Sequence, residues 1–339
     1  MENISVKRVS SKDVAAAAGV SQSTVSRVYN ESKIPVSEDK RKKVLEVAER
    51  LGYRPSLIAR SLNQQSTKII GIVVRHFNSV VYMEALKLFI RKFQEKGFTT
   101  MVFNIKGDCE IESNLKTALE YQVAGLIITS ATLSSPLVAG CLRFNTPVFL
   151  FNRVSDGMKV NTVCHDNLEG GKRIADYLFN RGHRRLVYVS GEKLSSTNRD
   201  RQEGFISRAK SLGIEDVTVV EGDFTYQSGF RAAERLIGDK VKMDGVLCAS
   251  DYMAMGFYDY IRTRTSLSIP ADISLIGFDG MSLFNEDMYP ITTYQQPIER
   301  MVEKTVEQLI YKTTRFSPDP VHYVYSGELI ERGSVRDFK

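Results

Sequence analysis

The sequence is poor in the residues that build metal centres and disulfide frameworks. Its 339 residues include four cysteines, four histidines and no tryptophan. Cys109, Cys141, Cys164 and Cys248 are far apart and form no C-x-x-C pair. Such spacing is typical of neither a structural zinc site nor a disulfide-stabilised fold. We therefore expect no metal ion and no other cofactor.

Long apolar runs are also absent. No stretch approaches the roughly 20 apolar residues that span a membrane, and the N-terminal segment MENISVKRVSSKD contains no apolar signal region. We therefore expect a cytoplasmic protein without a membrane partner. A length of 339 residues is enough for two or three domains.

The common catalytic motifs of α/β enzymes are missing as well. No G-x-G-x-x-G follows residues 69–74, and no G-x-S-x-G is present. Gly170, Gly171 and Lys172 lack the earlier glycine and the following hydroxyl of a P-loop. His183 precedes an expected strand, where it is typical of a turn rather than of a general base. We expect no enzymatic activity, and an enzyme on the same fold is the alternative that steady turnover of a sugar or nucleotide would establish.

Positive charge, in contrast, is concentrated in the first fifth of the chain. Residues 1–62 hold 12 Lys and Arg residues against 7 Asp and Glu residues, a net charge of +5, whereas the whole chain has a formal net charge of +6. The rest of the chain is therefore close to neutral. This asymmetry favours a polyanion such as nucleic acid as the partner of the N-terminal segment.

That basic segment contains a pattern typical of two helices joined by a tight turn, KDVAAAAGVSQSTVSRVYN at residues 12–30. Gly19 permits the backbone angles of the turn, and Ser21 caps the second helix. Val25 and Val28 point inward, which leaves the polar side chains of the second helix to reach base edges in a major groove. An ordinary helical hairpin with a solvated face is the alternative. Ser37 begins a third helix over residues 38–51, which closes a small all-α domain.

From residue 69 onward, short apolar strands alternate with helical patterns. Strands are expected at 69–74, 101–105, 125–129, 147–151, 186–190, 217–220, 245–248 and 273–277, with a last extended segment at 321–329. Helices are expected at 81–96, 167–181, 199–212, 227–237, 251–264 and 297–311. This alternation predicts an α/β core of parallel sheets covered on both faces, and the number of strands suggests two lobes.

Polar and aromatic side chains follow the carboxyl ends of these strands, where open parallel sheets bind ligands. Carboxylates, an arginine, hydroxyls, an amide and aromatic rings are the chemistry of a cleft for a sugar or polyol. Each of them is also explained as a loop residue or a helix cap. Asp251, which opens the helix expected at 251–264, is a good example of a helix cap.

Collinear motifs from about Ser11 to Gly333 resemble the lactose/galactose-repressor (LacI/GalR) family. They include KDVAAAAGVSQSTVSRVYN, KKVLEVAERLGYRPSLIARSL, HDNLEGGKRIADYLFNRGHRRLVYVSG, RDRQEGF, EGDFTYQSGF, CASDYMAMGFYDYI, SIPADISLIGFDG and YPITTYQQPIERM. The resemblance implies a helix-turn-helix DNA-binding headpiece (1–56), a hinge helix and linker (57–67), and a two-lobed core like a periplasmic sugar-binding protein (68–339). Lobe 1 would take about 68–163 and 293–322, and lobe 2 about 164–292 and 323–339.

The resemblance also implies which residues touch DNA. Base-edge contacts are implied for Gln22, Ser23 and Arg27, and contacts to phosphates or within the headpiece for Thr24, Ser26 and Asn30. Leu62, with Ala59 beside it, would wedge into the minor groove at the centre of a pseudo-palindromic operator. The alternatives are that Arg27 clamps a phosphate and that Leu62 is a core residue.

A small-molecule effector, a sugar or sugar derivative, is implied in the cleft between the lobes. Together with the strand ends, the resemblance predicts these effector-binding residues: Phe77, Tyr82, Ser130, Arg153, Arg201, Phe224, Asp251 and Asp279. Members of the family often carry P-D-x-x-N-P-F-F after the first core strand, whereas this chain has RHFNSVVY. Arg75 in that segment either adds charge for an acidic effector or is a surface residue.

We therefore expect a transcriptional repressor that binds its operator as a homodimer, with a tetramer as the alternative. The effector would move the lobes and thereby change operator affinity. A regulator whose core responds to a protein partner is the alternative mechanism.

Overall fold

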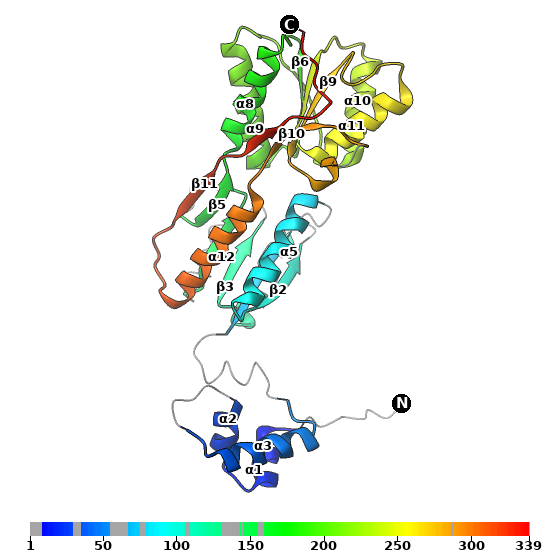
Figure 1. Cartoon of the computed structure of the whole chain (residues 1–339). Helices are drawn as coiled ribbons and strands as arrows, with labels where there is room; N and C mark the ends of the chain where they lie inside the picture. The colour runs from blue at the N-terminus through cyan, green and yellow to red at the C-terminus, as the bar shows by residue number, and fades with distance from the viewer. Residues whose placement is uncertain are drawn as a thin grey trace. The chain divides into compact units, whose positions relative to one another are not determined.

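The computed structural model describes residues 9–29, 35–54, 67–74, 79–105, 109–129, 141, 143, 145–154, 159–285 and 288–338. The chain divides into two compact units, Met1–Thr67 and Lys68–Lys339. Figure 1 shows a helical N-terminal unit and an α/β unit of two lobes. Most of the predicted hinge segment, including Ala59 and Leu62, lies outside the described residues.

The first unit is a bundle of three helices: α1 (Ser11–Ala18), α2 (Gln22–Tyr29) and α3 (Glu38–Arg50). Ser10 and Asp13 form a capping box that satisfies the first backbone donors of α1. Gly19 has φ of 66°, the left-handed conformation that glycine adopts without strain. Small apolar side chains from all three helices make the core, namely Val14, Ala15, Ala18, Val25, Val28, Val44, Val47 and Ala48. Ala17, in contrast, is exposed.

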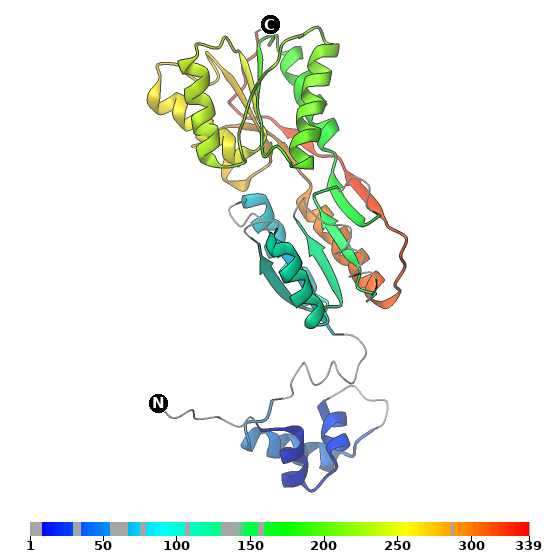
Figure 2. The same cartoon turned by 180° about the vertical axis from the view of Figure 1, so that it is seen from behind.

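The first lobe is built on a parallel sheet with the strand order β11-β5-β4-β3-β1-β2. Its strands are β1 (Ile69–Val74), β2 (Thr99–Asn104), β3 (Gly125–Ile128), β4 (Val148–Phe151), β5 (Asn161–His165) and β11 (His322–Tyr325). Ile70 and Ile72 pack against α5 (Val80–Glu95) and α12 (Ile298–Thr314), whereas Val73 packs against α6 (Cys109–Glu120). Since neighbouring strand residues point to opposite faces, both faces of the sheet are covered. Figure 2 shows α6 on the side away from α5 and α12.

The second lobe repeats this plan with the strand order β12-β10-β9-β8-β6-β7, in which only β12 is antiparallel to its neighbour. Its strands are β6 (Leu186–Val189), β7 (Thr218–Val220), β8 (Gly245–Cys248), β9 (Ser274–Asp279), β10 (Thr292–Gln295) and β12 (Glu328–Ile330). Its helices are α8 (Asn167–Asn180), α9 (Ser196–Ser211), α10 (Tyr226–Gly238), α11 (Asp251–Arg264) and the short 3₁₀ helix η1 (Ser282–Asn285). The pairs α8–α9 and α10–α11 cover opposite faces of the sheet (Figure 1).

The chain crosses between the lobes three times: after β5, after β10 and after β11. The sequence placed these crossings at about residues 163, 292 and 322, and the strands carry each of them a few residues further. β5, β10 and α6 were not among the expected elements. β5 (NTVCH) and β10 (TTYQ) are polar for buried strands, so they lack the continuous apolar run by which the other strands were recognised.

Candidate functional site

Helix α2 presents the polar surface predicted to read DNA. Gln22 and Ser23 are exposed, and Arg27 is half-buried. Ser21 begins the helix as predicted, because its Oγ accepts a hydrogen bond from the backbone N–H of Thr24 at 3.2 Å. Arg27 forms no ion pair with any residue that the structure describes. Its guanidinium is the kind of group that can bind a base edge or a phosphate.

The other predicted DNA contacts divide between the headpiece and the undescribed segments. The Oγ1 of Thr24 lies 2.8 Å from the Oγ of Ser21, and Ser26 is half-buried. Asn30, Ala59 and Leu62 lie outside the described residues. On α3, four consecutive basic side chains are exposed, Lys40, Arg41, Lys42 and Lys43. They supply the kind of charge that attracts a phosphate backbone without reading its sequence.

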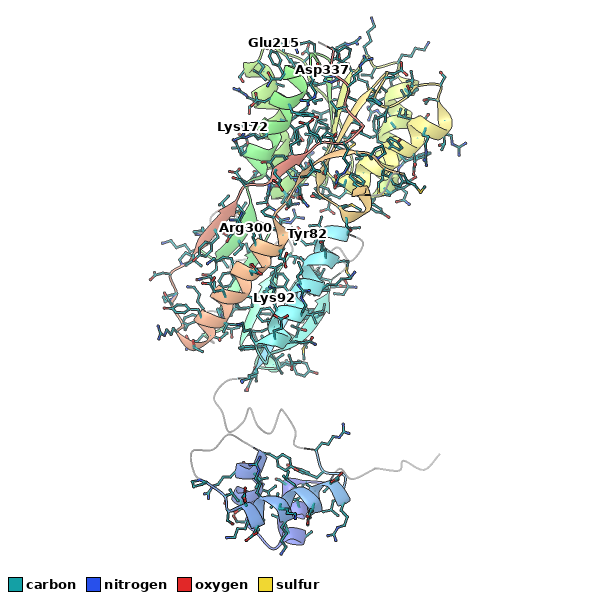
Figure 3. The ribbon with its side chains drawn as sticks, viewed as in Figure 1. Tyr82, Lys92, Lys172, Glu215, Arg300 and Asp337 are labelled. Atoms are coloured by element: carbon teal, nitrogen blue, oxygen red, sulfur yellow. The ribbon has the colours of Figure 1, made fainter. Side chains whose placement is uncertain are left out.

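A cleft of about 580 Å³ opens between the two lobes of the second unit. From the first lobe it is lined by Ser79, Val80, Val81, Tyr82, Asn104, Ile105 and Arg153. From the second lobe it is lined by Thr197, Arg201, Asp223, Phe224, Thr225, Gln227, Ser250, Tyr252, Asp279 and Met281. Tyr82 lies at the end of α5 nearest the second lobe (Figure 3). A concave site of this size, with polar groups and aromatic faces, suits a small molecule.

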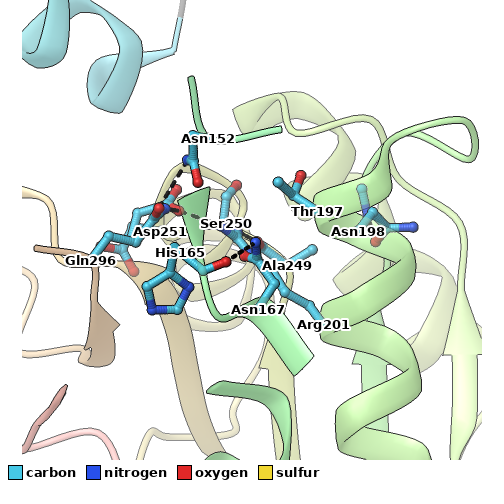
Figure 4. A network of polar contacts seen from close by, with 12 residues as sticks. Asn152, His165, Asn167, Thr197, Asn198, Arg201, Ala249, Ser250, Asp251 and Gln296 are labelled. Atoms are coloured by element: carbon cyan, nitrogen blue, oxygen red, sulfur yellow. Dashed lines mark hydrogen bonds and ion pairs between the residues drawn. The ribbon is translucent and has the colours of Figure 1, made fainter. Parts of the chain in front are cut away.

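Arg201 is the most extensively bonded side chain of the cleft, although only 2% of it is exposed. Its Nε donates to Oδ1 of Asn167 at 2.8 Å, and its Nη1 donates to the carbonyl of Ala249 at 2.5 Å (Figure 4). Nη1 also lies 3.1 Å from Oδ1 of Asp279, and the guanidinium stacks 3.8 Å from the centre of the Phe278 ring. These contacts fix the guanidinium before any ligand arrives.

Asp279 and Phe224 hold unusual backbone conformations beside Arg201. Their φ angles are 130° and 66°, values that residues other than glycine rarely adopt. Oδ1 of Asp279 accepts a hydrogen bond from Nε2 of Gln296 at 2.6 Å. Burial raises the pKa of Asp279, and the adjacent positive charge of Arg201 opposes that shift. Backbone strain of this kind concentrates at ligand sites, where the surrounding structure maintains it.

Asp251 does not line the cleft, contrary to the sequence-based assignment. Its side chain is fully buried and accepts hydrogen bonds from the backbone N–H groups of Gly280 and Met281, at 2.9 and 2.7 Å. The hydroxyl of Thr293 donates to its other oxygen at 2.6 Å. Nor is it the cap of α11, since Ser250 occupies that position. In this structure Asp251 therefore supports the loop that follows Asp279 and lies behind the residues that line the cleft.

Arg153 and Asn152, which follow β4, reach across to the second lobe. Nη1 of Arg153 donates to the hydroxyl of Ser195 and, at 3.0 Å, to that of Thr197. Nδ2 of Asn152 donates to Oε1 of Gln296 at 2.9 Å. The guanidinium of Arg153 lies 5.9 Å from the centre of the Tyr82 ring. These hydrogen bonds connect the two lobes, so they break when the distance between the lobes increases.

His165 ends β5 at the first crossing between the lobes. It is 2% exposed, and neither ring nitrogen has a hydrogen-bond partner. Burial lowers its pKa to about 3, and the charge of Arg201 adds to the effect. The centre of its ring lies 5.5 and 5.6 Å from those of Phe278 and Tyr294, and the rings pack edge-on. His165 is therefore a neutral core residue at the crossing between the lobes.

Five predicted effector residues thus lie in one cleft, namely Tyr82, Arg153, Arg201, Phe224 and Asp279. Phe77 and Ser130 lie outside the described residues. Sequence reasoning missed Thr197 and Asn167, which lie at the starts of α9 and α8 rather than at strand ends. In the sequence they were visible only as polar residues typical of a helix start, a pattern that is not specific to ligand sites.

Each of the two units matches a known protein family. Residues 11–56 match the family described as bacterial regulatory proteins, lacI family, and residues 175–335 match the periplasmic binding protein-like domain. The ribose operon repressor of Escherichia coli (strain K12) is 31% identical over 328 residues, covering 96% of this chain and 99% of that protein. The chain belongs to the lacI family. This lacI-family protein is a DNA-binding transcriptional repressor controlled by an effector, not an enzyme.

Solved structures confirm the fold. The Lac repressor dimer bound to operator and the anti-inducer ONPF has a TM-score of 0.87 at 24% identity, covering 97% of this chain and 100% of that one. The complex of the transcriptional regulator CelR with cellobiose has a TM-score of 0.73 at 27% identity, covering 96% and 100%. Among the described residues of this repressor, no helix is both long and apolar enough to cross a membrane.

Proposed function

We propose that this repressor binds a pseudo-palindromic operator as a homodimer and that a small sugar or sugar derivative in the interlobe cleft controls it. The main support for this proposal is the cleft, where aromatic faces and buried hydrogen-bonding groups from both lobes lie close together. The complex of CelR with cellobiose supports a sugar-like ligand, and the operator complex of the Lac repressor dimer supports the assembly.

Coupling between the cleft and DNA follows from the bonds that cross between the lobes. Arg153 and Asn152 hold the lobes at one separation, so a ligand that changes this separation shifts the first lobes of the two subunits. In this proposal the headpiece is residues 1–56 and the hinge is residues 57–67, with Ala59 and Leu62 in the minor groove. Binding of effector and of operator are then reciprocally linked, typically by 1–3 kcal/mol.

Selection of inverted-repeat duplexes from random DNA, followed by titration with sugars, tests the proposal. A preferred inverted repeat whose affinity changes with one sugar is the expected result. Failure to prefer any inverted repeat over random DNA would contradict it.

Two variants test the DNA-reading helix. Arg27→Ala is expected to relax base choice at one position of each half-site, by roughly 1–3 kcal/mol. Arg41→Ala, the matched control, is expected to weaken all sequences alike because an exposed charge on α3 acts through phosphates. An unchanged base preference in Arg27→Ala would exclude its contact with a base.

A variant of the cleft tests the effector site. Arg201→Lys, which keeps a positive charge beside Asp279, is expected to reduce the response to effector strongly while operator binding persists, because the headpiece is a separate unit. A response curve identical to that of the wild type would show that the effector binds elsewhere.

A further inference from the structure

Arg153 has no counter-ion in direct contact among the residues that the structure describes, although its charge acts on Asp279 at longer range. The residue is 4% exposed, and the hydrogen bonds that it makes to described residues go from Nη1 to two neutral hydroxyls. Its Nε is buried without a partner, and no carboxylate of a described residue lies within ion-pair distance of it. Arg201, by contrast, is paired with Asp279. Burying an arginine without a counter-ion is costly unless a bound ligand supplies the negative charge.

The N-terminus of α5 opens on the same cleft. Val80, Val81 and Tyr82 form its first turn, and all three line the cleft. Ser79 stands at the cap position without a side-chain hydrogen bond to the helix, and the first turn contains no acidic residue. The first N–H groups of this 16-residue helix therefore keep their partial positive charge, which favours an anion.

These two features meet at Tyr82. Its backbone belongs to the first turn of α5, and its ring lies 5.9 Å from the guanidinium of Arg153. The two carboxylates that line the cleft are engaged elsewhere in the second lobe. Asp279 binds Arg201 and Gln296, and Oδ1 of Asp223 accepts from the hydroxyl of Thr225 at 2.5 Å. Neither carboxylate neutralises Arg153 by direct contact.

We propose that Arg153 and the first turn of α5 together bind an oxyanion, so that the effector is a small polyhydroxylated molecule carrying a phosphate or a carboxylate. This inference rests on the proposed effector site in the cleft. The anionic group lies against the first lobe, and the hydroxyl groups of the ligand face Arg201, Asp279 and Asp223 on the second lobe.

Inorganic phosphate is the first probe, because it carries the shared chemistry without requiring a particular carbon skeleton. Thermal unfolding of the full chain is measured in phosphate and in sodium chloride of equal ionic strength. The wild type is expected to melt at a higher temperature in phosphate, by mass action. Arg153→Gln is expected to weaken the apparent phosphate affinity at least tenfold, whereas Arg173→Gln, at an exposed arginine of α8, is expected to leave it unchanged.

Ser79→Asp keeps the test decisive should Arg153→Gln fold poorly. Aspartate is a good helix cap, so α5 is preserved or strengthened, yet its charge repels an anion at the same point. This variant is expected to show a smaller phosphate response than the wild type, because only the part due to the cleft is lost. A wild-type response that does not exceed the chloride response, or equal phosphate responses in wild type and Ser79→Asp, would overturn the proposal. Phosphate bound by the basic headpiece cancels in this comparison, since all variants share that unit.

Calorimetry with ribose, ribose 5-phosphate and ribonate then distinguishes the two sources of the anion. Either anionic form is expected to bind at least tenfold more tightly than ribose, and to lose that advantage in Arg153→Gln. Ribose binding more tightly than both anions would overturn the proposal while leaving the repressor function intact. Operator binding, measured separately, tests the proposed function without bearing on the anion site.

Discussion

The two walls of the interlobe cleft differ in how fully their polar side chains are bonded. On the second lobe, Arg201, Asp279 and Ser250 make hydrogen bonds or ion pairs within their own lobe. On the first lobe, the side chains of Ser79, Tyr82 and Asn104 make no hydrogen bond to any residue that the structure describes. The hydrogen bonds of Arg153 to described residues both run across the cleft. Much of the second wall is thus organised in advance, whereas these polar groups of the first wall remain available to a ligand.

This difference separates stability from ligand response. A substitution in the bonded second wall breaks interactions that exist without ligand, so it lowers the free energy of unfolding. A substitution in the first wall removes groups that bond only when ligand is present, so it lowers ligand affinity instead.

The largest effect is expected from removing the carboxylate of Asp251, which is buried behind the second wall. Asp251→Ala leaves two backbone N–H groups and the hydroxyl of Thr293 buried without their acceptor. We expect a loss of about 3 kcal/mol in the free energy of unfolding of the core, measured by urea denaturation. Asp223→Ala, at an exposed carboxylate of the same cleft, is the matched control and is expected to cost less than about 1 kcal/mol. Equal losses would show that burial does not set the difference.

Close packing of helices behind the second wall gives the next largest effect. A Cβ on Gly204 of α9 would lie 2.0 Å from the carbonyl oxygen of Leu168, a backbone atom of α8. The two helices must therefore move apart in Gly204→Ala, at a cost of about 2 kcal/mol. Gly238→Ala, at the end of α10, meets nothing within 4 Å and is the control. Urea denaturation of both variants compares them, and an unchanged midpoint in Gly204→Ala would contradict the packing.

Much of this architecture was predictable from sequence, and the exceptions have physical reasons. Strand β1 has the expected bounds because its run of branched side chains is buried on both faces. β10 was missed because its threonines are buried by bonding other groups, as Thr293 does with Asp251. Asp251 was assigned to the effector because a carboxylate at a strand end suits a ligand. Only the tertiary structure shows that this carboxylate already accepts hydrogen bonds from Gly280 and Met281. Arg153 was recognised as a cleft residue, but its lack of a counter-ion depends on distances that no sequence pattern encodes.

The stability of the core is expected to depend on the protonation of His165, at the crossing between the lobes. The pKa of His165 is about 3 in the folded chain and about 6.5 when unfolded, so between these values the unfolded state binds more protons. This contribution to stability is therefore fully present above pH 6.5 and falls as the pH falls, by about 1 kcal/mol at pH 5.5. Asp251 works in the opposite direction, because its raised pKa makes the folded state bind the extra proton.

The two contributions are separated by comparing His165→Leu with the wild type. Leucine has no titrating nitrogen and leaves no buried donor unpaired, so this variant is expected to lack the acid-dependent loss. Denaturation midpoints at pH 7.5 and 5.5 measure the effect, and His322→Gln, at an exposed histidine, is the control. Parallel pH profiles for His165→Leu and wild type would exclude His165 as the source.

The smallest effect compares the same chemical change at a cleft residue of the first lobe and at a core residue of the second lobe. Tyr82→Phe removes a hydroxyl that bonds to no described residue, so stability is expected to stay within about 0.5 kcal/mol of wild type. The affinity for the sugar that alters operator binding is expected to fall about fivefold, or about 1 kcal/mol. Tyr188→Phe removes a buried hydroxyl that donates to Oδ1 of Asn198 at 3.0 Å, so it is expected to cost about 1 kcal/mol of stability. Calorimetric titration and urea denaturation of both variants measure the two effects. A stability loss in Tyr82→Phe equal to that in Tyr188→Phe would mean that the hydroxyl of Tyr82 is already bonded within the protein before ligand arrives.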